Sequence, residues 1–243
     1  MIVLFTDFGL RGPYTGQMKA VLHTHAPGVP VVDLLSDAPA FDPRSSAYLL
    51  AAYARPFPAG AVFLVIVDPG VGSDRLPCVV RADDRWFVGP ENGLFELVMR
   101  RAVAPVLCWQ IDWRPHRLSN TFHGRDLFAP VAARLALGEP PPGGEVPAES
   151  LRRPEWPDDL PAILYLDSYG NAVSGLRAAS VPASATIVAG STACERARTF
   201  SEVPKGHPFW YENADGLVEI AVNSGRAADL FAFSPGTRLL IQP

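Results

Sequence analysis

The sequence predicts an α/β fold in its N-terminal part, with a mainly parallel sheet flanked by helices, and a smaller all-β, barrel-like domain in its C-terminal part. Strand-like apolar runs alternate with helix-like segments through the first half of the chain. A segment rich in Pro and Gly follows, and those residues cannot continue a helix or a central strand. The remainder holds short β-like runs separated by turn residues, which favour a small sheet or barrel.

The N-terminal elements come in the order of a covered sheet. Strands are expected at residues 2–5 and 62–67, because these short runs are apolar throughout, and at residues 29–34, which are strand-like. An expected hairpin joins residues 78–81 to residues 85–88. The helical pattern indicates four helices, at residues 14–25, 45–53, 94–102 and 126–136. The last of these stops before Gly138, a favourable residue for a helix end.

The composition shift sets the expected domain boundaries. We expect an N-terminal α/β domain at residues 1–138, a linker at residues 139–160 and a C-terminal barrel-like domain at residues 161–243. The β-like runs of the last domain lie at residues 162–166, 185–189, 217–222 and 237–241.

Composition excludes several classes of function. The formal net charge is −4 and Lys and Arg form no block, so nucleic acid is not an expected partner. The first residues lack the basic start of a signal peptide, and no apolar run is long enough to span a membrane. Three scattered cysteines fit reduced thiols. These features predict a cytoplasmic protein with a small-molecule ligand.

Asp68 is the first candidate for chemistry. It ends the apolar run at residues 62–67 and is followed by Pro69 and Gly70. Ligands of open α/β sheets bind beyond the carboxyl ends of strands, so this carboxylate is expected to face a cleft. A solvated Asp in a Pro-Gly turn is the alternative.

Other polar residues have both a functional and a structural interpretation. Asp7 ends the first expected strand and either accepts hydrogen bonds from a ribose diol or closes a turn. His123 precedes a helix, where a histidine is more often structural. The segment from Asp167 to Asn171 offers a carboxylate, an aromatic ring and an amide, yet it also fits a β-turn. No zinc-protease, phosphate-loop or serine-hydrolase motif occurs.

Together the motifs resemble the S-adenosylmethionine hydroxide adenosyltransferase family, relatives of the fluorinase and chlorinase enzymes. The matching segments run nearly end to end: TDFG at 6–9, GQMK at 16–19, VDPGVGSDR at 67–75, GPENGL at 89–94, TFHGRDLFAPVAA at 121–133, DSYGN at 167–171 and EIAVN at 219–223. The resemblance implies an N-terminal α/β domain, a C-terminal barrel-like domain, and homotrimers whose active sites lie between neighbouring subunits.

The implied reaction is hydrolysis of S-adenosyl-L-methionine to adenosine and L-methionine, without a cofactor or metal. Asp68, Arg75 and His123 match the family's water-activating triad. The sulfonium leaving group departs neutral and needs no general acid, so a positioned water is the main requirement. A carboxylate at position 68 repels a halide, which favours water as the nucleophile.

Residues of both domains are implied in substrate binding. Asp7 would hold the ribose diol, with Phe8 beside it in the TDFG motif and Phe41 over the ribose. The remaining implied residues serve the amino-acid end and the adenine: Asp167, Tyr169, Asn171, Phe209, Val222 and Asn223. The chain departs from the family at Gly12, where an acid is common, and at Ala214, where a Ser is frequent. A His usual after the second strand is also absent from residues 34–37.

The departures from the family pattern and the acidic residues leave two alternative functions for the protein. One is a non-catalytic regulatory protein that binds adenosine or S-adenosylmethionine. The other is a metal-dependent phosphohydrolase that uses Asp7, Asp68 and His123, and activity that survives thorough chelation would dispose of it.

Overall fold

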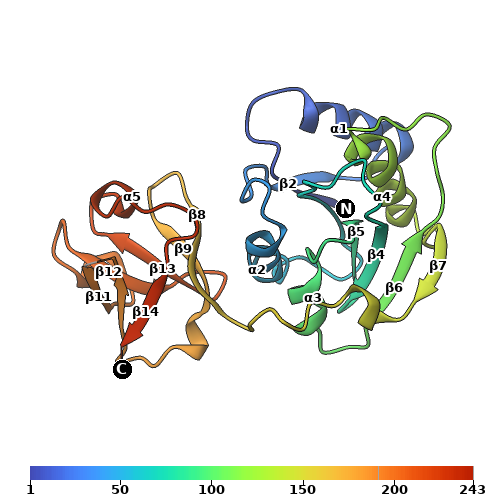
Figure 1. The fold of residues 1–243 in the computed structure, drawn as a ribbon. Coiled ribbons are helices and arrows are strands. Elements are labelled where there is room, and N and C mark those ends of the chain that lie inside the picture. Colours follow the sequence, from blue (N-terminus) through green and yellow to red (C-terminus); the bar gives the residue numbers. More distant parts are fainter. Residues whose placement is uncertain (191, 243) are drawn as a thin grey trace. The chain divides into compact units, whose positions relative to one another are not determined.

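The computed structural model describes residues 1–190 and 192–242, and the chain forms two compact units, Met1–Pro154 and Glu155–Pro243. Ser191 and Pro243, which belong to the expected C-terminal domain, lie outside the described residues. The first unit is three-layered and the second is close to a barrel (Figure 1).

The first unit is built on a mixed sheet with strand order β2-β1-β3-β5-β4-β6-β7. Its parallel half consists of β2 (Val31–Leu35), β1 (Ile2–Thr6), β3 (Val62–Ile66) and β5 (Arg85–Pro90). Its antiparallel half adds β4 (Pro77–Ala82), β6 (Leu107–Ile111) and β7 (Gly143–Val146). The expected parallel pairing is therefore confirmed for β2, β1, β3 and β5. The hairpin β4–β5 reverses the strand direction, and β4, β6 and β7 pair antiparallel.

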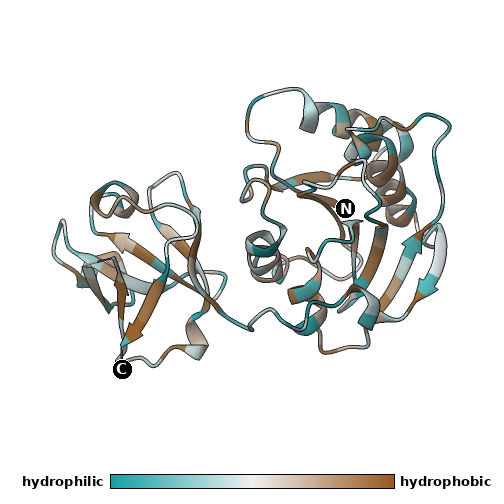
Figure 2. Cartoon of the chain, in the orientation of Figure 1, coloured by the Kyte–Doolittle hydropathy of each residue, from teal (hydrophilic) through white to brown (hydrophobic). Residues whose placement is uncertain are grey.

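Helices cover both faces of this sheet. Figure 1 shows α1 (Tyr14–His25) and α4 (Ala129–Ala136) on one face, and α2 (Pro43–Tyr53) and α3 (Glu96–Arg100) on the other. Alternate residues of β3 serve the two sides: Val62, Leu64 and Ile66 join the core beneath α1 and α4, while Phe63 stacks on Phe87. Because both faces are covered, the central strands β1 and β3 are apolar except at Thr6, as their mainly brown colour in Figure 2 shows.

The start of the last helix in this unit differs from expectation. Residues Gly124–Phe128 form a π-helical turn that leads directly into α4, so the helical region begins earlier than the expected residue 126. The wider turn at this point follows His123 and packs Gly124 tightly, since a Cβ there would lie 3.1 Å from the Met18 sulfur. Helical irregularities of this kind are frequent at functional sites.

Strands β6 and β7 were not expected, and β7 lies inside the segment expected to be a linker. Gly143 explains how a Pro- and Gly-rich segment joins a sheet: a Cβ at this residue would lie 1.9 Å from the Gln110 carbonyl oxygen. Only glycine permits that approach. A 3₁₀ turn (Ala148–Leu151) follows β7, and the first unit continues to Pro154.

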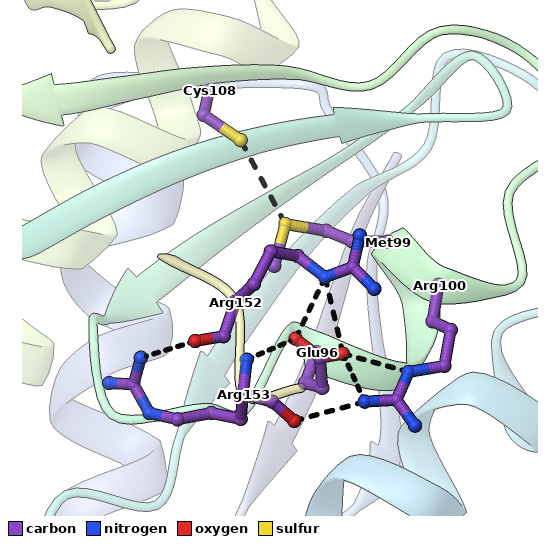
Figure 3. A network of polar contacts seen from close by, with 6 residues as sticks. All are labelled: Glu96, Met99, Arg100, Cys108, Arg152 and Arg153. Atoms are coloured by element: carbon purple, nitrogen blue, oxygen red, sulfur yellow. Dashed lines mark hydrogen bonds and ion pairs between the residues drawn. The ribbon is translucent and has the colours of Figure 1, made fainter. Parts of the chain in front are cut away.

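A buried carboxylate fixes the end of the first unit. Glu96 of α3 is fully buried and accepts hydrogen bonds from the side chains of Arg100 and Arg152 and from the main-chain N–H of Arg153 (Figure 3). Burial alone raises the pKa of Glu96, but these donors outweigh it and hold the pKa below its ordinary value. The carboxylate therefore stays charged and ties residues 152–153 to α3.

The described residues of the second unit form a seven-stranded sheet in the order β14-β10-β11-β12-β13-β9-β8. Main-chain bonding between its two edges nearly closes it, with Ile163 N–H donating to the Thr237 carbonyl at 2.8 Å. The expected barrel-like domain is confirmed. Its strands are β8 (Leu160–Leu166), β9 (Ala172–Arg177), β10 (Thr186–Ala189), β11 (Thr192–Arg196), β12 (Pro208–Glu212), β13 (Leu217–Val222) and β14 (Leu239–Gln242).

The interior of the second unit is filled by apolar side chains around the fully buried Trp210, which donates to the Ala185 carbonyl. Short helical turns complete it, at Ala178–Ser180, Phe200–Glu202 and Ala227–Leu230. In the described part of the chain, we find no helix with the length and apolar character to cross a membrane.

Candidate active site

Two neighbouring parallel strands end in carboxylates at one edge of the first sheet. Asp7 follows β1 and Asp68 lies just beyond β3, and these strands pair in register up to Thr6 and Ile66. The Asp7 N–H donates to the Ile66 carbonyl at 3.2 Å, which brings the two strand ends together. Both carboxylates line a cavity of about 350 Å³ in this unit, together with Phe8, Tyr14, Phe41, Ile66, Val71, Thr121, Phe122, His123 and Gly124.

Arg75 joins Asp68 to His123. Its Nε donates to Asp68 Oδ1 at 2.9 Å and its Nη2 donates to Asp68 Oδ2, so the pair is bidentate. The same Nη2 lies 2.9 Å from His123 Nδ1. The Asp68 and Arg75 side chains are only 5% and 10% exposed. Three residues separated by up to 55 positions in the sequence thus form one hydrogen-bonded group at the cavity.

The Arg75 contact fixes the tautomer of His123. A guanidinium only donates hydrogen bonds, so the imidazole Nδ1 must accept and the ring proton must be on Nε2. Burial lowers the pKa of His123, and the Arg75 charge lowers it further. His123 is therefore a neutral imidazole near pH 7, and its Nε2–H takes no part in the contact with Arg75.

The loop between Asp68 and Arg75 depends on glycine. Gly72 has φ +82°, and a Cβ there would lie 2.6 Å from the Asn120 carbonyl oxygen. The loop is also bonded within itself, since Ser73 Oγ donates to the Gly70 carbonyl at 2.7 Å. The segment that precedes His123 thus packs against the loop that carries the other two residues.

Asp7 is the second carboxylate that lines the cavity. The Phe41 N–H donates to its Oδ2 at 3.1 Å, and burial raises the pKa of the carboxyl, with the Asp68 charge acting in the same direction. Phe41 has φ +59° and is 78% exposed, so its main chain is held while its ring stands outward. The rings of Phe8, Tyr14 and Phe122 pack against one another at centroid distances of 5.4–5.8 Å, which gives the cavity an aromatic wall.

A second cavity, of about 620 Å³, lies in the second unit. It brings together four of the residues singled out from the sequence, Asp167, Tyr169, Asn171 and Val222. Asp167 accepts both the main-chain N–H of Asn171 at 2.8 Å and its side-chain Nδ2 at 3.1 Å. Tyr169 is 76% exposed and presents its ring at the surface.

Glu219, Tyr211 and Phe200 also line this cavity and were not singled out from the sequence. Tyr211 Oη donates to Glu219 Oε1, and Asn213 Nδ2 donates to Oε2 at 2.9 Å. Burial raises the pKa of both Tyr211 and Glu219. The signal available in the sequence was the EIAVN motif, in which a charged Glu219 sits among apolar strand residues.

Two expected binding residues are turned away from the second cavity. Phe209 is 1% exposed and lies beneath Phe200 and Tyr211, so it supports the wall without lining it. The Asn223 side chain donates to the Val203 carbonyl at 2.6 Å and is absent from the cavity lining. Phe209 and Tyr211 share a face of β12, so strand alternation does not separate them, and Phe200 covers Phe209 with ring centroids 5.0 Å apart.

Comparisons with known proteins cover both units. Residues 2–143 match the SAM hydroxide adenosyltransferase N-terminal domain, and residues 161–240 match the C-terminal domain of the same family. The chain belongs to the SAM hydroxide adenosyltransferase family. The resemblance inferred from the sequence motifs is thereby confirmed.

Several family relatives match over nearly the full chain. A Thermus thermophilus protein named (R)-S-adenosyl-L-methionine hydrolase is 39% identical, covering 97% of this chain and 96% of that protein. A protein of the same name from Salinispora arenicola is 38% identical over 97% of this chain and 95% of its own length. A fluorinase from Nocardia brasiliensis is more distant, at 22% identity over 58% of this chain and 55% of the fluorinase.

Solved structures agree with this membership. The crystal structure of an uncharacterized conserved protein from Thermotoga maritima has a TM-score of 0.89 and 28% identity, with 100% of both chains covered. That of a conserved hypothetical protein from Thermus thermophilus has a TM-score of 0.77 and 37% identity, covering 98% of this chain and 99% of that one.

In the part of the chain that is described, we find no group of three or more His, Cys, Asp or Glu side chains placed to hold a metal ion.

Proposed function

We propose that this protein hydrolyses S-adenosyl-L-methionine to adenosine and L-methionine. The observation that carries the proposal is the hydrogen-bonded group of Asp68, Arg75 and His123 at the cavity of a SAM hydroxide adenosyltransferase. Full-length relatives named (R)-S-adenosyl-L-methionine hydrolase support it. Their names specify the (R) form at sulfur, and we extend the same preference to this protein.

The reaction is a single displacement at C5′ of the substrate. A C5′–O bond forms from water while the C5′–S bond breaks, and the electron pair of that bond stays on sulfur as the neutral thioether of methionine. One proton of the water must leave. Bulk water has a pKa of about 15.7, so the side chains and the substrate's positive charge share the work of stabilising hydroxide character.

Asp68 is the proposed acceptor of that proton, and it takes the proton directly. A relay through His123 is less suited to the geometry, because Nδ1 already accepts from Arg75 and Nε2 already carries a proton. His123 would instead donate its Nε2–H to the water oxygen and stabilise charge developing there. Arg75 would hold the other two residues in place.

The same arrangement supports water over halide as the nucleophile. A chloride or fluoride ion beside the Asp68 carboxylate, which is 5% exposed, meets a like charge in a poorly solvated place. Such juxtaposition costs several kcal/mol. Water carries no charge and can donate to the same oxygen.

Substrate contacts are proposed from both units. Asp7 would accept from the ribose hydroxyls, and Phe8 and Phe41 would pack on the sugar and base. Asp167, Tyr169 and Asn171 would serve the adenine and the methionine end, with Val222 beside them. Phe209 and Asn223 would act as supports for that wall, since the first is covered and the amide of the second is bonded to Val203.

We further propose a homotrimer with sites shared between subunits, which rests on the family resemblance, and a cytoplasmic location, which rests on the composition. The mass in solution tests the homotrimer: light scattering should give three times 26.2 kDa. Complementation tests the shared sites. Asp68→Asn and Asn171→Ala subunits, co-expressed with different tags and purified as mixed oligomers, should regain activity that neither variant has alone. A monomer, or mixed oligomers without activity, would contradict this proposal.

The hydrolysis itself is tested by incubating the protein with S-adenosyl-L-methionine and separating adenosine and methionine by chromatography. Asp68→Asn should abolish product formation. Asp74→Asn is the matched control, because Asp74 is an exposed carboxylate in the same loop. Running the assay on each sulfur epimer tests the (R) preference. Tight adenosine binding without any turnover would reject hydrolysis and favour a regulatory binding protein, an interpretation that Gly12 and Ala214 keep open.

A further inference from the structure

The GPENGL segment at residues 89–94 has no role in the function proposed above. Its first two residues end β5, and the rest runs beside the loop that carries Asp68 and Arg75. Gly89 is required for strand packing, because a Cβ there would lie 2.3 Å from the Val65 carbonyl oxygen. The two polar residues, Glu91 and Asn92, need a different explanation.

Glu91 and Asn92 bond both ends of the catalytic loop. Asn92 Nδ2 donates to the Val67 carbonyl at 2.9 Å, and Val67 is the residue directly before Asp68. The Glu91 N–H donates to the Leu76 carbonyl at 2.8 Å, and Leu76 is the residue directly after Arg75. Adjacent residues thus hold the entry and the exit of the loop together.

The orientation of the Asn92 amide is defined by its partners. Its Oδ1 accepts from the Leu94 N–H at 3.3 Å while its Nδ2 donates to a carbonyl. Flipping the amide would place oxygen against the Val67 oxygen and nitrogen against the Leu94 N–H. Val67 is fully buried, so its carbonyl has little access to water as a replacement donor.

Glu91 is in turn braced from the end of the first unit. Arg153 Nη2 donates to Glu91 Oε1 at 2.9 Å. The main-chain N–H of Arg153 donates to the buried Glu96 at 2.6 Å, within the network of Figure 3. A chain of hydrogen bonds therefore runs from Glu96 through Arg153 to the Glu91 side chain, and the Glu91 main chain bonds the exit of the loop.

We propose that Asn92 is a positioning residue for hydrolysis, with the Glu91–Arg153 pair as its brace. This inference rests on the proposed function. Asn92 touches neither the cavity nor the triad side chains. It fixes the main chain at Val67, and thereby the place of the Asp68 carboxylate relative to Arg75 and to the attacking water. A misplacement of about 1 Å at such a site costs about 10²-fold in rate.

The experiment compares Asn92→Ala and Asn92→Asp with the wild type. Both variants lose the donor to Val67, whereas only Asp adds a charge and keeps the acceptor for Leu94. The kcat for S-adenosyl-L-methionine is divided by the number of adenosine-binding sites counted by calorimetry, so unfolded protein does not affect it. We expect kcat per site to fall between about 10-fold and 10²-fold in both variants, with the adenosine Kd changed less than threefold.

Arg153→Met tests the brace, and Arg134→Met is its matched control. Arg134 also pairs with a glutamate, Glu139, at 2.8 Å, but it lies in α4 and does not contact the GPENGL segment. Arg153→Met should lower kcat per site severalfold, and Arg134→Met should leave it unchanged.

The outcomes separate this inference from the proposed function. If the wild type makes no adenosine, the proposed function fails. If the wild type is active and both Asn92 variants keep its kcat per site, the positioning role is wrong, whatever their melting temperatures. A loss confined to Asn92→Asp would also overturn it, because the added charge and not the lost hydrogen bond would then be responsible.

Discussion

Replacing Arg75 with Met tests the central group of the site most directly. The change removes three hydrogen bonds, two to Asp68 and one to His123, and keeps an apolar side chain against the Phe128 ring, which the guanidinium carbon faces at 5.1 Å. It leaves the Asp68 carboxylate, 5% exposed, without its cation. We expect a loss of both stability and rate.

The size of the stability loss follows from burial. Removing one partner of a buried ion pair costs about 3–5 kcal/mol, because the remaining charge is left uncompensated. Neutralising that charge as well should recover much of the loss. The double variant Asp68→Asn/Arg75→Met is therefore expected to be at least about 2 kcal/mol more stable than Arg75→Met alone.

The rate loss should be larger than a change in binding. Proton transfer by a positioned group contributes about 10²–10⁴-fold, and both the position of Asp68 and the tautomer of His123 depend on Arg75. Arg75→Lys keeps the charge but cannot form the bidentate pair and reach His123 together, so it should recover stability more than kcat.

Urea unfolding of the four proteins gives the free energies, and adenosine formation gives kcat. The reasoning is refuted if Arg75→Met loses less than about 1 kcal/mol, or if the double variant is no more stable than the single one. If Arg75→Lys keeps the wild-type kcat, the rate depends only on the positive charge of residue 75 and not on its bidentate hydrogen bonding.

Three further predictions concern other parts of the first unit. Burial and the Arg75 charge lower the pKa of His123, so kcat/KM should decline on the acid side below about pH 6.5. The pH profile of His123→Gln should lack that decline. The free energy of unfolding measured in urea should likewise fall as pH drops from about 6.5 through the lower pKa of His123 in the folded state. Gly72→Ala should cost at least about 1–2 kcal/mol in thermal unfolding, because φ is +82° and a Cβ would meet the Asn120 carbonyl at 2.6 Å; an unchanged Tm would contradict the loop geometry. Glu96→Ala should cost about 2–3 kcal/mol by urea unfolding, at the low end for buried pairs because the freed arginines can reach water.

Much of the fold could be predicted from local pattern. The strands β1 and β3 are buried along their whole length and are apolar except at Thr6, and α1 has the predicted bounds, because these elements show their burial in their own residues. Strands β6 and β7 could not be predicted in this way. Residues 143–146 directly follow three prolines and begin with two glycines, and they become a strand only because β6 offers a free edge and Gly143 lets the chains approach.

The residues that line the second cavity could likewise be predicted only in part from the sequence. Asp167 and Asn171 stood out because polar residues follow an apolar strand. Phe209 and Tyr211 are both aromatic and two residues apart, and nothing in their sequence says which is covered. The packing of Phe200 over Phe209 decides it.

The sequence by itself determined the two-part architecture, the strand-end carboxylates Asp7 and Asp68, and, through its motifs, the family. The tertiary structure decided what the polar residues do to one another. Only folding brings Arg75 between Asp68 and His123, and the one-sided donor chemistry of the guanidinium then fixes the histidine tautomer. Only folding places Asn92 against Val67. Hydrogen bonds act over about 3 Å, so these relationships depend on spatial neighbours that lie 7 to 48 positions apart in the chain.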